Sequence, residues 1–112
     1  MRRSADFAST VRTGRQARRG SVVVHHDRAA SGPGVPAQVG FIVGKSVGGS
    51  VVRHRTSRRL RAVMAAHLDQ LPSGSATVLR ALPSAALASS AELAADVGAA
   101  LDRVIEHAEV AR

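Results

Sequence analysis

The chain has 112 residues, no cysteine, and 16 Lys and Arg side chains against 8 Asp and Glu, for a net charge of +8. This length fits a single domain over residues 1–112 that can bury a core without disulfides. The lack of cysteine excludes a disulfide scaffold, a thiolate zinc site and a cysteine nucleophile. No apolar run approaches the roughly 20 residues of a membrane helix, and no apolar segment follows the basic amino-terminus, so we expect a cytoplasmic protein.

The positive charge is concentrated in one half of the chain. Residues 1–61 hold 13 basic and two acidic side chains, whereas residues 62–112 hold three basic and six acidic ones. A block this positive is typical of a surface that binds phosphate, because released counterions favour binding to a polyanion. Fifteen of the 16 basic residues are Arg, an excess that GC-rich coding would explain equally well.

The first predicted elements are a short helix and a strand. Ser4 can cap a helix in which Phe7 and Val11, four residues apart, share one face. Gly14 can end that helix. Residues Val22–His26 are expected to form a strand, because β-branched valines favour extended backbone.

A loop, a second strand and a long helix come next. Residues 31–36, Ser-Gly-Pro-Gly-Val-Pro, are loop residues, which we expect to join antiparallel neighbours, and residues 38–43 favour a strand. After a glycine-rich turn, the spacing predicts a helix from Val51 to Leu71, closed by Pro72. At about 100° per residue, one arc of this helix is apolar and contains Val52, Thr56, Leu60, Val63, Met64, His67, Leu68 and Leu71. The opposite arc carries Arg55, Arg58, Arg59 and Arg61.

The last third predicts one strand and one helix. Residues Ser75–Leu82 alternate as in a strand. Ser89 and Glu92 have the spacing of a capping box, and the helix that follows has a core stripe of Leu93, Val97, Leu101, Val104 and Ile105. With one further short strand, either before Val22 or near Ser46, the order is α-β-β-β-α-β-α. This order is typical of an α/β (α+β) sandwich in which helices pack on a four-stranded sheet.

The histidines do not have the spacing of a metal site. His25 and His26 are adjacent in a predicted strand, so their side chains point to opposite faces and cannot share a metal. His67 lies in the apolar stripe, which is typical of a packed core histidine, and His107 lies on a solvated helix turn. Because no set of serine, histidine and acid stands out either, we expect no catalytic residue and no metal site in the protein.

Phosphate contact is instead predicted for the segment from residue 45 to residue 61. It contains six cations within 17 positions, Lys45, Arg53, Arg55, Arg58, Arg59 and Arg61, and no acidic residue occurs between Arg28 and Asp69. A solvated helix face normally mixes both signs of charge. The start of the helix also directs N–H groups and a positive dipole at an anion. We therefore expect nucleic-acid contact here.

Residues 44–61 resemble the signature of the bacterial ribonuclease P protein component. The matching positions are Lys45, Gly48, Val51, Arg53, Arg55, Arg58 and Arg61. Phe7 with Gly14 resembles the family's first helix and turn, and residues 80–83 resemble the strand end before its last helix. The departures are Gly49 and His54 in place of Asn, Ser46 and Ser57 in place of Lys, and Val11 and His25 in place of aromatic residues.

The resemblance implies a left-handed β-α-β crossover and a protein subunit of ribonuclease P, the endoribonuclease that removes the 5′ leader from precursor tRNA. In that family the RNA subunit performs the hydrolysis with Mg²⁺. The six cations would contact the catalytic RNA, while Phe7, Val11 and His25 would line a cleft for the single-stranded leader. With only two aromatic residues, binding should depend more on charge than on base stacking.

We also expect no membrane contact and no obligate protein partner. A ribosomal or general RNA-binding module without a role in processing shares the same charge and remains the alternative. A peripheral membrane protein is a further one, although the basic helix has no aromatic anchor in its apolar stripe.

Overall fold

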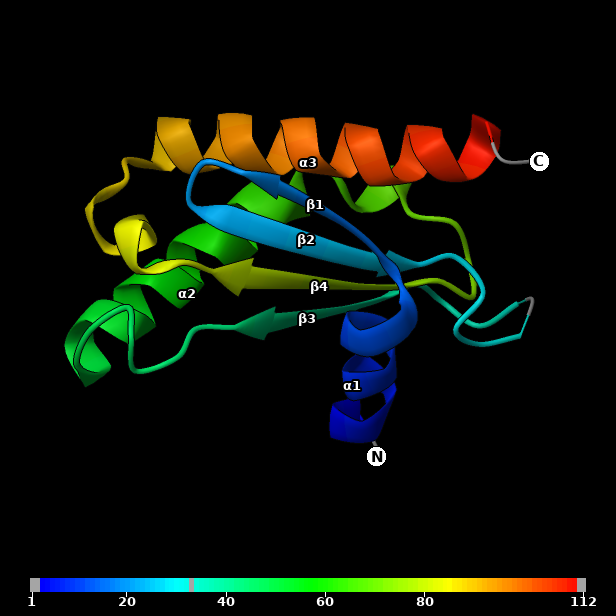
Figure 1. The fold of residues 1–112 in the computed structure, drawn as a ribbon, viewed down its shortest axis with the longest axis horizontal. Coiled ribbons are helices and arrows are strands. Elements are labelled where there is room, and N and C mark those ends of the chain that lie inside the picture. The colour runs from blue at the N-terminus through cyan, green and yellow to red at the C-terminus, as the bar shows by residue number, and fades with distance from the viewer. Residues whose placement is uncertain (1–2, 33, 111–112) are drawn as a thin grey trace.

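Four strands form one mixed sheet that carries helices on both faces (Figure 1). The structure is a computed structural model that describes the backbone of residues 3–32 and 34–110 and the side chains of residues 7–32 and 34–105. The elements in chain order are α1 (Arg3–Thr13), β1 (Arg15–Arg19), β2 (Val22–Asp27), β3 (Gln38–Ile42), α2 (Ser50–Ala65), η1 (Leu68–Gln70), β4 (Ala76–Ala81), η2 (Pro83–Leu87) and α3 (Ser90–Val110). The α-β-β-β-α-β-α order is confirmed, and its extra strand is β1, before Val22.

The strand order in the sheet is β1-β2-β4-β3. β2 is antiparallel to both β1 and β4, whereas β3 is parallel to β4. The expectation that the loop after β2 joins neighbouring strands is therefore wrong, because β4 lies between β2 and β3. As a central strand with helices over both faces, β4 is buried at every position except Arg80.

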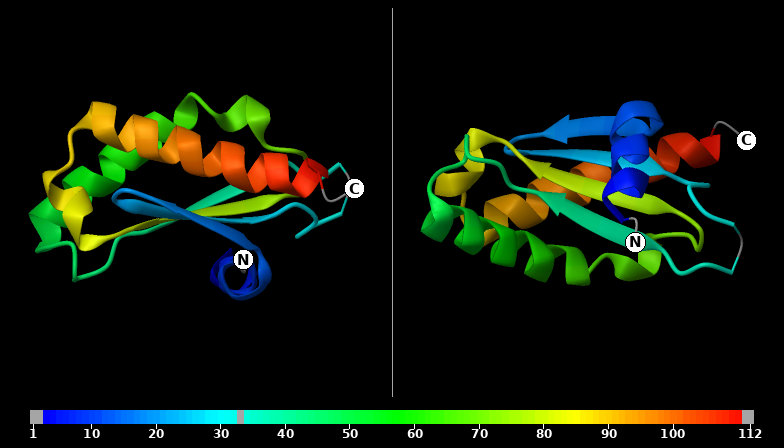
Figure 2. Two further views of the ribbon diagram at one scale, coloured as in Figure 1. Left: turned by 45° about the horizontal axis from the view of Figure 1, so that its top comes forward. Right: turned by 90° about the horizontal axis from the view of Figure 1, so that it is seen from below.

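The β3-α2-β4 connection is left-handed, against the usual hand of such crossovers. In Figure 1 both strands run to the left, β4 lies above β3, and α2 passes behind the sheet. Figure 2 shows the same arrangement from below, with α1 and α2 on opposite sides of the strands.

The main core lies between the sheet and the pair of helices α2 and α3 (Figure 2). The predicted stripe of α3 enters this core, since Leu93, Val97, Leu101 and Val104 are buried. The capping box is confirmed by two reciprocal bonds: the Ser89 N–H donates to Glu92 Oε1 at 2.8 Å, and the Glu92 N–H donates to Ser89 Oγ at 3.0 Å. In the described part of the chain, no helix is long and apolar enough to cross a membrane.

α1 crosses the opposite face of the sheet and ends where Gly14 brings it against β2. The helix begins at Arg3, so Ser4 lies inside it and the expected cap is wrong. The Gly14 N–H donates to the Thr10 carbonyl at 2.8 Å. A Cβ on Gly14 would lie 2.6 Å from that carbonyl oxygen and 2.8 Å from the His26 carbonyl oxygen. Glycine is therefore required here by the close approach of two backbone segments.

α2 is shorter than the sequence predicts. It ends at Ala65, and the next residues form tighter turns, with the Ala66 N–H on the Val63 carbonyl at 3.2 Å and the His67 N–H on the Met64 carbonyl at 2.9 Å. This tightening takes the later apolar residues off the helical stripe, so that Leu68 is exposed. Thr56, Leu60 and Met64 form the buried face of α2.

Candidate nucleic-acid interface

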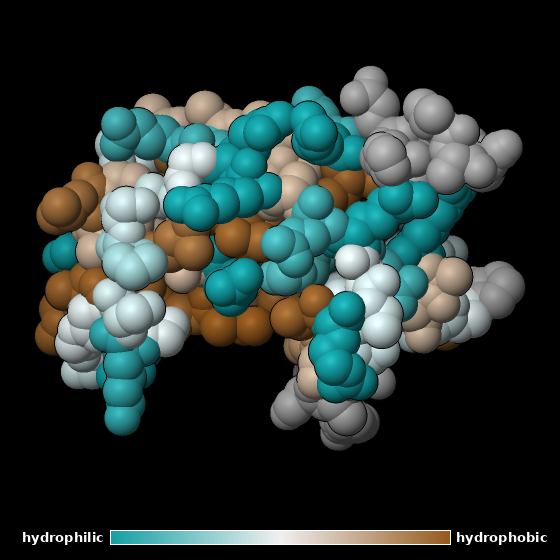
Figure 3. Space-filling view, in the orientation of Figure 1, coloured by the Kyte–Doolittle hydropathy of each residue, from teal (hydrophilic) through white to brown (hydrophobic). Residues whose placement is uncertain are grey.

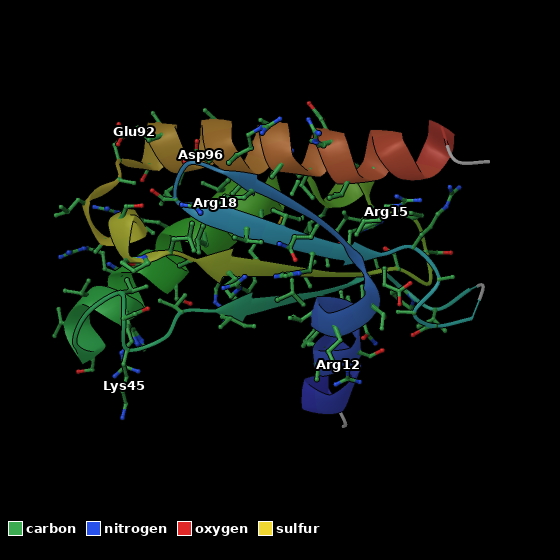
Figure 4. All side chains as sticks on the ribbon, viewed as in Figure 1. Arg12, Arg15, Arg18, Lys45, Glu92 and Asp96 are labelled. Carbon is green, nitrogen blue, oxygen red and sulfur yellow. The ribbon has the colours of Figure 1, made fainter. Side chains whose placement is uncertain are left out.

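The outward face of α2 presents Arg55 and Arg58. At about 100° per residue, these two arginines lie roughly 140° and 160° around the helix from Leu60, which is buried. Arg58 is exposed and Arg55 is half-buried. Lys45 is exposed in the turn before α2 and projects away from the body of the protein (Figure 4).

Two other cations occupy the flanks of α2. One guanidinium N–H of Arg59 donates to the Ala88 carbonyl at 3.1 Å, which ties α2 to the segment before α3. The expectation that Arg59 lies on the solvent-facing arc is therefore wrong, and its assignment to RNA stays a prediction with one donor already engaged. On the other flank, the Arg61 guanidinium carbon lies 4.8 Å from the centre of the Phe41 ring. This cation–π contact positions Arg61 while leaving its N–H groups free.

A pocket between the end of β3 and the first turns of α2 contains the sixth cation. Its lining combines an aromatic ring, a guanidinium, an imidazole and two hydroxyls, from Phe41, Val43, Ser50, Arg53, His54 and Ser57. The Nε atom of Arg53 is buried and has no hydrogen-bond partner. The guanidinium and the two hydroxyls that line the pocket carry hydrogen-bond donors, so this pocket suits an acceptor such as a phosphate or a ribose hydroxyl.

The start of α2 leaves backbone donors open beside these cations. Gly49 is the residue before the helix and provides no side-chain cap, and the first turn has no acidic residue. Gly48 has φ +155°, and a Cβ there would lie 2.9 Å from the Val52 Cβ. The turn therefore needs glycine at position 48, and it exposes a helix amino-terminus that favours an anion.

None of these six cations pairs with a carboxylate among the side chains of residues 7–32 and 34–105. Acidic side chains gather on α3 instead, where Glu92 and Asp96 lie on the far side of the molecule from Lys45 (Figure 4). Asp96 accepts a hydrogen bond at 3.2 Å from the Ser21 N–H in the β1–β2 turn. The six cations and these two carboxylates thus lie on different parts of the molecule.

The face that carries α1 is hollowed between α1 and the loop bearing Lys45 (Figure 3). This hollow, here called the α1-side groove, has the α1-facing residues of the sheet as its floor. The ring of Phe7 lies against Gly40 of β3, since a Cβ on Gly40 would be 2.7 Å from that ring. Phe7 and Val11 are both half-buried and lie four residues apart, on one face of α1; the assignment of Phe7 and Val11 to leader binding stays a prediction.

His25 lies beneath this surface rather than on it. Its side chain is 1% exposed, and neither ring nitrogen has a hydrogen-bond partner. Burial lowers the pKa of His25, and the positive charge of Arg80 on the neighbouring strand lowers it further. A base could stack on this ring only if the residues that cover it moved, so the assignment of His25 to leader binding stays a prediction.

His26 points to the other face, as predicted, with its Nδ1 2.9 Å from Thr77 Oγ1. Burial lowers the pKa of His26, although Asp27 acts in the opposite direction. His67 is half-buried near Gly98 of α3, and its Nδ1 lies 3.2 Å from Gln70 Nε2. The side chain of His107 lies outside the described residues. Within the described residues no three His, Asp or Glu side chains could jointly hold a metal ion.

Two functional candidates were not anticipated from the sequence, namely Arg18 of β1 and Arg80 of β4. Both lie on the α1 side of the sheet, because they alternate with Ala17 and Leu79, which are buried in the main core. That alternation was visible in the sequence. The adjacency of β2 and β4, which brings the two arginines to one surface, was not.

The comparisons with known proteins point to one family. The chain matches the family model described as Ribonuclease P over residues 1–105. It is 46% identical over 111 residues to the ribonuclease P protein component of Streptomyces bikiniensis, covering 94% of this chain and 90% of that protein. The corresponding protein of Corynebacterium diphtheriae is 49% identical over 105 residues, covering 90% of this chain and 88% of the relative.

Solved structures of ribonuclease P proteins share the fold. The protein from Staphylococcus aureus superposes with a TM-score of 0.77 at 18% sequence identity, covering 91% of each chain. The protein from Thermotoga maritima gives a TM-score of 0.72 at 14% identity, covering 95% of this chain and 94% of that one.

Proposed function

Because the chain belongs to the ribonuclease P protein family, we propose that it binds the catalytic RNA of ribonuclease P through α2 and the 5′ leader of precursor tRNA through the α1-side groove. Ribonuclease P is a tRNA 5′ processing endoribonuclease, and this chain is its protein component. In the proposal the RNA subunit cuts the phosphodiester bond, and the protein positions the substrate and lowers the repulsion between two polyanions.

The support for the α2 contact is a set of cations that have no anionic partner among the described side chains. Lys45, Arg55 and Arg58 project from the start and the outer face of α2, and Arg53 lines the pocket beside them. A planar guanidinium fork matches the geometry of a phosphate, and an RNA backbone supplies phosphates at regular intervals. The open amino-terminus of α2 adds backbone N–H donors to the same surface.

The support for leader binding in the groove is its shape and position. Phe7 lies against Gly40 beside a hollow surface that faces away from Glu92 and Asp96 of α3, and Val11 lies one helical turn further along the same face of α1. A single strand lying there would be adjacent to Lys45, in the turn that leads into α2. One protein of this size could then contact the catalytic RNA and the leader at the same time.

The proposal places Mg²⁺ on the RNA subunit. The donor set of the described side chains does not fit a protein-bound ion, because no three acidic or histidine side chains converge, and Mg²⁺ prefers several oxygen ligands. Held by the RNA subunit, Mg²⁺ would supply Lewis-acid chemistry for the hydrolysis. The protein's arginines would act by neutralising nearby phosphates, which lets the complex form at lower Mg²⁺ concentration.

The observation that carries this proposal is a cationic surface on α2 that no described carboxylate neutralises, in a chain of this family. Reconstitution with the cognate catalytic RNA tests it, by measuring cleavage of precursor tRNA at low Mg²⁺ with RNA alone, protein alone and both. We expect efficient cleavage only with both components. Cleavage by the protein alone would refute the division of roles, and an absence of stimulation would favour a general RNA-binding module.

A further inference from the structure

A row of side chains crosses all four strands on the α1 side of the sheet. Arg18 of β1 pairs with Val23 of β2, and Val23 pairs with Arg80 of β4. Ile42 of β3 pairs with Arg80 on its other side. Phe7 contacts the next row, at Gly40, so this row lies beside α1 and forms part of the floor of the groove.

Among the side chains of residues 7–32 and 34–105, neither arginine of the row has a counter-ion on this face. Arg80 is half-buried, its Nε is buried without a hydrogen-bond partner, and its charge lowers the pKa of His25. Arg18 is exposed. Among the described side chains, the sheet surface under α1 carries one carboxylate, Asp27, which lies at the far end of β2 and accepts a hydrogen bond from the Ala29 N–H at 3.1 Å.

The same surface offers no free aromatic ring for a base. The Phe7 ring is in contact with Gly40, and His25 is buried. Phe41, the second phenylalanine, faces α2 under Arg61, and the chain has no Tyr or Trp. Base stacking on aromatic side chains, which is a common way to hold a single strand, is therefore minimal in this groove.

We propose that Arg18 and Arg80 hold successive phosphates of the leader across the floor of the groove, so that this protein binds the leader by its backbone and is largely indifferent to its base sequence. The inference rests on the proposed function, which places the leader in this groove. Two interstrand spacings put the Cα atoms of the two arginines about 10 Å apart, a separation that their long side chains can adjust to neighbouring phosphates. Phosphate contacts position a strand but carry no sequence information.

The experiment measures the affinity of the reconstituted holoenzyme for precursor tRNA and for tRNA without a leader. One variant is Arg80→Gln. The other is Arg18→Gln, which serves if Arg80→Gln fails to fold, because Arg18 is exposed and tolerates substitution. Arg19→Gln is the matched control, since it removes the same charge from the adjacent residue on the opposite face of β1. In parallel, a neutral methylphosphonate replaces each leader phosphate in turn, on a 2′-O-methyl nucleotide.

We expect Arg80→Gln to weaken binding of the leader-bearing substrate about tenfold or more, with little change for the leaderless one and little effect of Arg19→Gln. At one leader position, the methylphosphonate should weaken substrate binding by the wild-type holoenzyme by a similar factor. The same methylphosphonate should not weaken binding by the Arg80→Gln holoenzyme any further, since the effects of two groups in contact are not additive. Base changes in the leader should have less than the roughly fivefold effect of one base-specific contact.

Three results would overturn the inference. The first is that the effects of Arg80→Gln and of the methylphosphonate on affinity add up at every leader position. The others are an equal loss of affinity in Arg19→Gln and a strong dependence of affinity on the bases of the leader. Failure of the proposed function is distinct, because the wild-type holoenzyme would then show no preference for the leader-bearing substrate.

Discussion

Replacing Arg58 by Ala should change the salt dependence of binding to the catalytic RNA by a calculable amount. Five of the six cations, all except Arg59, keep their charged groups free of hydrogen bonds and ion pairs to described residues. Each phosphate that such a cation neutralises adds about 0.9 to the slope of log affinity against log salt. Five contacts predict an affinity loss of about 500-fold between 50 and 200 mM salt, and four contacts predict about 150-fold.

The assay is equilibrium binding of the protein to labelled catalytic RNA over this salt range at constant Mg²⁺. Arg103→Ala on α3 is the control, because Arg103 is also exposed and its loss changes the net charge equally. We expect the control to keep the wild-type slope. Equal slopes for Arg58→Ala and the wild type, or the same reduction in Arg103→Ala, would refute the assignment of the outer face of α2 to RNA.

Three other variants test the groove and its supports. His25→Leu removes two buried nitrogens without partners, so the free energy of unfolding at pH 7.5 should rise by about 1 kcal/mol or more. Because the pKa values of His25 and His26 are below the ordinary 6.5, the unfolded chain binds more protons than the folded one, and the free energy of unfolding should fall as pH drops below about 6.5. This fall should be smaller in His25→Leu. Urea titrations at two pH values measure both proteins, and the same pH dependence in the variant and the wild type would contradict the reasoning. Phe7→Ala should weaken binding of leader-bearing tRNA more than of mature tRNA, and equal losses would argue against the groove. Gly14→Ala should lower the free energy of unfolding by about 1–3 kcal/mol, because backbone oxygens lie within 2.8 Å of the new Cβ. The control Gly44→Ala, where the new Cβ meets nothing within 4 Å, should not lower it. Equal denaturation midpoints for the two variants would show that α1 adjusts freely.

Local patterns along the chain were sufficient to predict most elements. Three valines in a row predicted β2, and the spacing of Ser89 and Glu92 predicted the cap of α3, because both depend on residues close in sequence. The cationic segment could be placed on a helix for the same reason. The contacts of the arginines on the flanks of this helix could not be predicted, since the partner of Arg59 is the Ala88 carbonyl, 29 residues away.

The arrangement of the sheet depends on contacts that no local pattern encodes. β4 pairs with β2 and β3 at once, so the groove floor, with Arg18 and Arg80 in one row, exists only after three segments distant in sequence have come together. The end of α2 was missed for a different reason. The apolar spacing continues to Leu71, but the backbone tightens after Ala65, a change that hydrophobic periodicity does not report.

The absence of cysteine from the chain allows the most direct measurement of which face meets the RNA. A single cysteine is introduced either at Ala62, exposed on α2, or at Ala99, exposed on α3, and an iron chelate attached to it generates hydroxyl radicals in the assembled holoenzyme. We expect strand cuts in the catalytic RNA from position 62 and none above background from position 99. Cuts from position 99 alone, or the same cuts from both positions, would contradict binding through α2.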